Sequence, residues 1–145
     1  MAELAVEDLE VQLQSYLNCL ELCRALHGQT DDQDVKEALD PVIDDLQTSL
    51  GTLASHLRQW GAAPGTFQID RQGKTRTREM LGMRSLSEKM SAIRDCLADL
   101  VAWYAEHPPA DQTDPSIRDW LVPLSTHTQH VLEWWDQQMR EMGAT

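Results

Sequence analysis

Residues 35–61 read VKEALDPVIDDLQTSLGTLASHLRQWG, and residues 117–143 read IRDWLVPLSTHTQHVLEWWDQQMREMG. At an offset of 82 residues, the two stretches keep a proline, an apolar phase and a terminal glycine. Six pairs are identical, where residue frequencies would give about two. They are Leu39/Leu121, Pro41/Pro123, Gln47/Gln129, Leu50/Leu132, Arg58/Arg140 and Gly61/Gly143. A match of this kind indicates one structural unit used twice.

Apolar residues recur at alternating spacings of three and four in four segments, which predicts four helices. The first spans residues 4–27 and the second about 33–60, with either a kink or a later start near Pro41. The third begins between Thr77 and Ser85, where Ser85 and Glu88 would form a capping box, and it stops before the prolines at 108–109. The fourth begins at Pro115 and runs to about residue 142.

The order of these segments predicts the fold. Residues 61–76 have the composition of a loop and no helical stripe, so we expect a long crossover there. A weaker match at an offset of 77 relates the first helix to the third. We therefore expect an all-α, single-domain four-helix bundle over residues 1–145. It would consist of two repeated helical hairpins, 4–60 and 77–142, joined by the crossover 61–76.

Composition limits the classes of function. The chain has 145 residues, a net charge of −12 and a hydrophobic content of 41%, which is typical of a globular domain. The negative charge would repel nucleic acid and anionic membranes. We see neither a secretory signal nor an apolar run long enough to span a membrane. Three cysteines, an odd number, favour reduced buried thiols and a cytoplasmic location.

The duplicated hairpins, the crossover and the ending His56-Leu57-Arg58-Gln59-Trp60-Gly61-Ala62-Ala63-Pro64 resemble the ferritin-like superfamily, in particular small bacterial ferritin-like proteins of unknown function. The resemblance implies, for metal-binding members, an inward Glu on two helices and a Glu-x-x-His on each of the other two. This chain contains no Glu-x-x-His. Leu53 stands three residues before His56, and the second repeat has Trp135 and Gln138 at the matching places. We therefore expect no di-iron site, no ferroxidase activity and no cofactor.

Two groups of residues are candidate metal ligands, and each has a purely structural alternative. His127, His130 and Glu133 lie three apart in the fourth helix and would bind a divalent metal if a fourth ligand joined them. Otherwise they are histidines at the edge of the core. A second group, with Cys19, Cys23 and His27 one turn apart, would form a metal or redox site, or the thiols pack as small apolar groups.

Basic residues concentrate between positions 71 and 84, which is unusual in so acidic a chain. They are Arg71, Lys74, Arg76, Arg78 and Arg84. The segment would bind phosphate or an acidic partner, or lie against acidic helices of its own chain or of a second subunit. Its lack of interleaved aromatic residues argues against nucleic-acid binding.

Surplus apolar residues indicate a further surface to cover, because each helix of a bundle needs only one buried stripe. The first helix has a second line, Leu4, Val11, Leu22 and Leu26, and the fourth carries Trp120, His127 and Trp134 at seven-residue steps. We expect a homodimer through these two helices, or cover by the crossover with Phe67 and Ile69. No catalytic motif stands out. The sequence thus favours a non-catalytic bundle that acts through self-association or protein binding, with a small metal-binding or redox protein as the alternative.

Overall fold

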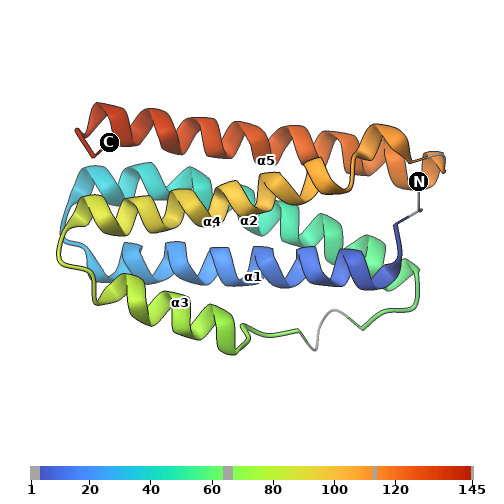
Figure 1. Cartoon of the computed structure of the whole chain (residues 1–145), viewed down its shortest axis with the longest axis horizontal. Coiled ribbons are helices and arrows are strands. Elements are labelled where there is room, and N and C mark those ends of the chain that lie inside the picture. Colours follow the sequence, from blue (N-terminus) through green and yellow to red (C-terminus); the bar gives the residue numbers. More distant parts are fainter. Residues whose placement is uncertain (1–3, 64–66, 113, 145) are drawn as a thin grey trace.

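The computed structural model describes residues 4–63, 67–112 and 114–144, and over these residues it is all-α, without a strand. Five α-helices follow one another along the chain (Figure 1). Their bounds are α1 Val6–Gln29, α2 Gln33–Gln59, α3 Arg71–Leu81, α4 Leu86–Glu106 and α5 Pro115–Glu141, and a short 3-10 helix, η2, spans Pro109–Asp111. The expected all-α class is confirmed. The helix α2 continues through Pro41, so the later start considered for it is wrong.

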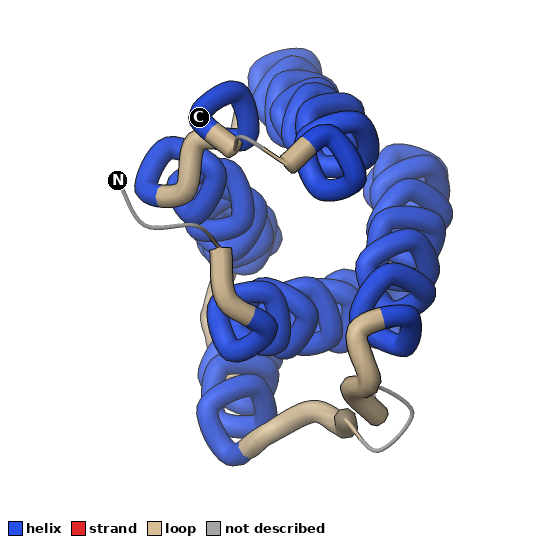
Figure 2. Tube along the Cα trace, turned by 90° about the vertical axis from the view of Figure 1, so that its right-hand side faces the viewer, coloured by secondary structure: helices blue, strands red, loops and turns tan. Residues whose placement is uncertain are grey.

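The four long helices contact one another in the cyclic order α1, α2, α5, α4. Seen along their length, they surround a shared interior, and α1 lies diagonally across from α5 (Figure 2). The fifth helix, α3, lies outside this ring and packs chiefly against α1. The helices α1 and α5, through which the sequence predicts a homodimer, are therefore not neighbours within the ring.

The expectation of a loop over residues 61–76 is wrong in its second half, because α3 begins at Arg71. The Asp70 side chain starts this helix by accepting a hydrogen bond of 2.8 Å from the Gly73 N–H. Only Gly73 and Met80 of α3 are buried, so its sequence carries almost no apolar periodicity. The helix is therefore defined by its cap and its docking rather than by a hydrophobic stripe.

Polar contacts near both ends of α3 hold it against α1, and in both contacts the paired residues are 52 positions apart. Near its start, the Asn18 amide donates to the Asp70 carboxylate at 3.0 Å. Near its end, the Gln29 amide donates to the Leu81 carbonyl at 3.0 Å. Both pairs are 52 residues apart, so the two helices run in parallel, as Figure 1 shows. Leu22 and Leu26 lie between these two points and are fully buried.

The cap predicted at the start of the third long helix is confirmed. The Ser85 hydroxyl accepts a hydrogen bond of 3.0 Å from the Glu88 N–H, and α4 begins at Leu86. Gly82 ends α3 three residues earlier. The two helices are therefore separated by a short link, which explains why the sequence left the start open between 77 and 85.

The ends of α2 and α5 repeat the same backbone chemistry 82 residues apart. Asp32 and Asp114 are the N-cap residues, and each side chain accepts from a backbone N–H two residues ahead, at 2.9 Å in both cases. At the other ends, Gly61 and Gly143 have positive φ angles of 86° and 69°. The next N–H in each case closes the helix, from Ala62 to Leu57 O at 3.0 Å and from Ala144 to Met139 O at 2.8 Å.

The interior of the ring is mostly apolar, and its polar groups include a cluster of hydroxyls that the sequence did not reveal and the Gln12 amide, which donates to the Leu100 carbonyl at 3.0 Å. The Tyr16 hydroxyl lies 2.7 Å from the Tyr104 hydroxyl and 2.5 Å from that of Thr128. Thr128 in turn donates to the Leu124 carbonyl at 2.9 Å. Buried hydroxyls are tolerated where they bond one another, and these link α1, α4 and α5. Inward-facing Leu, Ile, Met and Trp side chains fill the surroundings.

Candidate functional site

The side chains at seven-residue steps along α5 all contact α2, and we call this contact line the α2–α5 seam. The Trp134 indole N–H donates to the Ala38 carbonyl at 3.1 Å. His127 Nε2 lies 3.1 Å from Asp45 Oδ1, and the Trp120 ring stacks on the His56 ring at 4.1 Å. From Trp134 to Trp120 the residue numbers on α5 decrease, while those of their partners on α2 increase from 38 to 56, so the two helices are antiparallel. The seam is thus built by large side chains that bridge the two helices.

A groove of about 440 Å³ opens on this seam. Its walls are Thr48, Ser49, Thr52, Asp119, Trp120, Pro123, Leu124 and His127. The indole nitrogen of Trp120 is buried without a hydrogen-bond partner, and burial lowers the pKa of the stacked His56 ring. Further along α5, Trp134 keeps 38% of its surface exposed. The seam therefore presents two tryptophans along a helix whose groove is mostly apolar.

The predicted metal ligands in α5 do not converge. His127 pairs with Asp45, His130 is exposed to solvent, and the Glu133 carboxylate accepts from the Gln129 amide at 3.3 Å. Over residues 4–63, 67–112 and 114–144, no group of three His, Cys, Asp or Glu side chains is placed to hold a metal ion. The arrangement favours the alternative reading, in which these histidines lie at the edge of the core.

Three of the predicted interface residues are not at the surface. Leu4 retains 8% exposure, and Leu22 and Leu26 retain none, so their assignment to an exposed stripe is corrected. For Leu22 and Leu26 the reason is α3, which a helical wheel of α1 alone could not reveal. Val11 is the member of that line that stays open, with 60% of its surface exposed. Of the proposed contact residues, Val11, Trp120 and Trp134 therefore remain accessible.

The second predicted ligand group is divided by the fold. His27 turns toward α2 and pairs with Asp40 at 2.9 Å, while Cys19 and Cys23 point into the interior. There the Cys19 side chain lies next to those of Cys23 and of Cys96 in α4. Sequence reasoning missed Cys96, because only the packing of α1 against α4 brings it to Cys19. All three thiols are buried and free.

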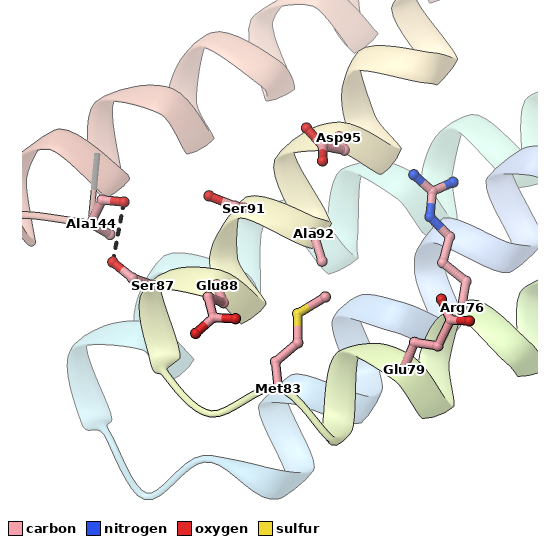
Figure 3. A pocket seen from close by; sticks show the side chains of 9 residues that line it. All are labelled: Arg76, Glu79, Met83, Ser87, Glu88, Ser91, Ala92, Asp95 and Ala144. Carbon is pink, nitrogen blue, oxygen red and sulfur yellow. Dashed lines mark hydrogen bonds between the residues drawn. The ribbon is translucent and has the colours of Figure 1, made fainter.

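A second groove, of about 450 Å³, separates α3 from α4 (Figure 3). Arg76 and Glu79 border it from α3, and Glu88 and Asp95 border it from α4. Met83 reaches in from the link between the two helices, and Ser87 closes one end by donating to the Ala144 carbonyl at 3.2 Å (Figure 3). The groove is thus acidic along α4.

The basic segment divides between the two sides of α3. Arg76 turns inward and pairs with Asp99 of α4 at 3.2 Å, as expected of a segment that lies against its own acidic helices. Arg71, Lys74 and Arg78 are exposed on the outer side. In the part of the chain that the structure describes, they make no ion pair within 4.0 Å. The inward arginine is therefore the one that contributes to a site.

No family model matches this chain, and it has no match among curated proteins or solved structures. Among the described residues, no helix combines the length and the apolar character needed to cross a membrane.

Proposed function

We propose that this chain is a non-catalytic helical module that acts through self-association, and that the α2–α5 seam is its contact surface. The observation that carries this proposal is the pair of tryptophans at the seam, one on each side of His127. Aromatic side chains that stay half-exposed beside a groove are typical of residues that dominate protein contacts. Two seams related by a twofold axis would cover Trp134 and the groove of each copy with the other.

The same proposal includes a ferritin-like arrangement of two equivalent hairpins, α1–α2 and α4–α5. The matching caps at Asp32 and Asp114 and the matching glycines support it, as does the cyclic packing order of the long helices. In this arrangement α2 and α5 are equivalent elements. A contact surface on the α2–α5 seam would therefore lie near the pseudo-symmetry axis of each subunit.

Thr48→Arg tests the contact surface with little risk to the fold. Thr48 is exposed, lines the groove and donates only to the Asp44 carbonyl of its own helix. We expect light scattering and sedimentation to show a dimer for the native chain. The arginine should weaken it at least about tenfold in Kd, because its charge would be buried at the contact.

Val11→Arg is the matched control, since Val11 is an exposed apolar residue that does not line the groove and lies on α1, a helix outside the α2–α5 seam. It should leave the association unchanged. A chain that stays monomeric at all concentrations would contradict the proposal. A dimer that responds to Val11→Arg but not to Thr48→Arg would place the contact elsewhere.

One observation favours a second candidate function, a small redox protein. Three buried thiols from two helices lie next to one another, and Cys96 also borders a cavity. A cysteine that only fills space in the core needs no second thiol beside it, and here three thiols from two helices lie together.

A further inference from the structure

The thiol group consists of a central cysteine with two neighbours. Cys19 of α1 lies next to Cys23, one turn along the same helix, and next to Cys96, on the neighbouring helix α4. At most 3% of any of the three side chains is exposed. Because Cys19 and Cys96 belong to different helices, a bond between them would join two elements that otherwise only pack together.

A small cavity gives access to this group. It has a volume of about 120 Å³, and its walls are Ser15, Asn18, Gln72, Gly73, Arg76, Cys96 and Asp99. This space is large enough for several molecules of the size of water. Three helices contribute to it, α1, α3 and α4. Cys96 is the thiol that lines it, so a small reagent entering the cavity would meet Cys96 first.

Arg76 places a positive charge at the same cavity. Its guanidinium is held by Asp99 at 3.2 Å and acts electrostatically on both Cys96 and Cys19, favouring their thiolate forms. Reactive thiols are found near cations at sites with limited access, and this cavity supplies a cation and access, although the Asp99 carboxylate in its wall offsets part of the arginine's charge.

We propose that Cys19 and Cys96 form a redox-active dithiol, which hydrogen peroxide entering this cavity converts to a disulfide between α1 and α4. In the first step, the Cys96 sulfur loses its proton and attacks one peroxide oxygen. The O–O bond breaks, and the departing hydroxide takes up a proton to become water, which leaves Cys96 as a sulfenic acid.

In the second step, the Cys19 sulfur attacks the Cys96 sulfur, and the S–O bond breaks. The hydroxide released there takes the Cys19 proton and leaves as a second water. Two electrons have passed from the two thiols to peroxide, which is reduced to two waters. A small dithiol reductant reverses the change by thiol–disulfide exchange.

Docking of α3 controls the rate of this reaction. The hydrogen bond with Cys19 and burial raise the pKa of the Cys96 thiol, so the thiolate is scarce while α3 covers the cavity. Only two residues of α3 are buried, Gly73 and Met80, and polar contacts hold the rest. A helix with so little buried surface opens more readily than the core. We therefore expect oxidation to proceed through the open form.

The first experiment treats the intact, reduced native chain with hydrogen peroxide, unfolds it in excess alkylating reagent and identifies the cysteine peptides by mass. The expected product is a Cys19–Cys96 disulfide that has lost two hydrogens, with Cys23 alkylated. Cys96→Ser should abolish the disulfide, whereas Cys23→Ser should leave it intact. These products are independent of oligomeric state, so this proposal and the dimer proposal fail separately.

The second experiment compares Gly73→Ala with Gly51→Ala. A Cβ at Gly73 would overlap the Asn18 amide and the Ile69 side chain, whereas one at Gly51 meets nothing within 4 Å. We expect Gly73→Ala to speed formation of the disulfide about tenfold by loosening α3, and Gly51→Ala to leave the rate unchanged.

Three results would overturn the proposal. The first is that the native chain and Gly73→Ala both keep free thiols under peroxide. The second is a disulfide that joins Cys19 to Cys23. The third is a Cys19–Cys96 disulfide that forms only after denaturation.

Discussion

The hydroxyl of Tyr16 bonds those of Tyr104 and Thr128, and in this way three helices meet at one oxygen atom. A buried hydroxyl without a partner costs about 1–3 kcal/mol, so the three groups are stable only together. An apolar core would accept several alternative packings of its leucines. This polar contact fixes the heights of α1, α4 and α5 relative to one another, because the hydroxyls lose their partners if any helix shifts along its axis.

The tyrosine pair predicts a distinctive response to alkali. Burial raises the pKa of both Tyr16 and Tyr104 above the ordinary value of 10.0, because the phenolate is poorly solvated in the core. Folding stability should therefore be unaffected below pH 10 and should fall as the pH rises beyond it, since only the unfolded tyrosines ionise readily. The chain contains two tyrosines, so tyrosinate absorbance reports on this pair alone.

That absorbance should rise together with the loss of helical circular dichroism in a pH titration. Tyr16→Phe is the control, because it leaves one tyrosine whose ionisation should still accompany unfolding. Tyrosinate that forms while the helices stay intact would contradict the placement of the pair in the core.

At the scale of the elements, α2 and α5 are two long helices with equivalent ends. Each begins at an aspartate cap, passes through an internal proline and ends at a glycine with positive φ. A residue with a Cβ atom is strained in that conformation, so glycine is required at both ends.

Gly61→Ala and Gly143→Ala should each destabilise the chain by about 1 kcal/mol in urea unfolding, because alanine pays the cost of the left-handed conformation. Gly51→Ala in the middle of α2 is the matched control. It should instead stabilise the chain by about 0.5–1 kcal/mol, since the added methyl group meets nothing and reduces the freedom of the unfolded chain. Terminal glycines that tolerate alanine as well as Gly51 does would show that these ends fray in solution.

The elements that the sequence could predict are those with a long apolar stripe. The ranges of α1, α2 and α5 follow from their periodicity within two residues, and Ser85 correctly located the start of α4. In contrast, α3 escaped prediction because its buried residues are a glycine and one methionine. The same omission misplaced Leu22 and Leu26, since a one-dimensional pattern identifies an apolar line without showing what covers it.

The candidate sites were predictable only in part. The sequence placed Trp120, His127 and Trp134 on one flank of α5, but their partners on α2 depend on how the hairpins pack. Likewise, Cys19 and Cys23 attracted attention through their spacing. Cys96, 73 residues beyond Cys23, joins them only in three dimensions.

At the scale of the whole molecule, charge opposes compactness. The chain has 24 acidic and 12 basic residues, and its net charge is −12. Ion pairs such as Arg76–Asp99 and Arg94–Asp136 are local and partly exposed, so each stabilises the fold only slightly. The repulsion acts over the entire surface, and it is therefore the larger of the two effects.

Adding sodium chloride from low ionic strength to about 0.15 M should raise the Tm by about 3 °C, because salt screens repulsion over distances longer than about 8 Å. Thermal unfolding followed by circular dichroism measures this, and an equal concentration of a neutral sugar serves as the control for solvent effects. A Tm that decreases with salt would mean that the local ion pairs outweigh the repulsion.

The place of α3 in chain order also matters during synthesis on the ribosome. The first hairpin and α3 leave the exit tunnel before α4, so Leu22 and Leu26 are shielded before α4 and α5 have emerged. Only the inward side of the α1–α2 hairpin then stays uncovered until the α4–α5 hairpin packs against it. A nascent chain arranged in this way exposes one apolar face of its first hairpin, rather than two, to other chains made on the same messenger.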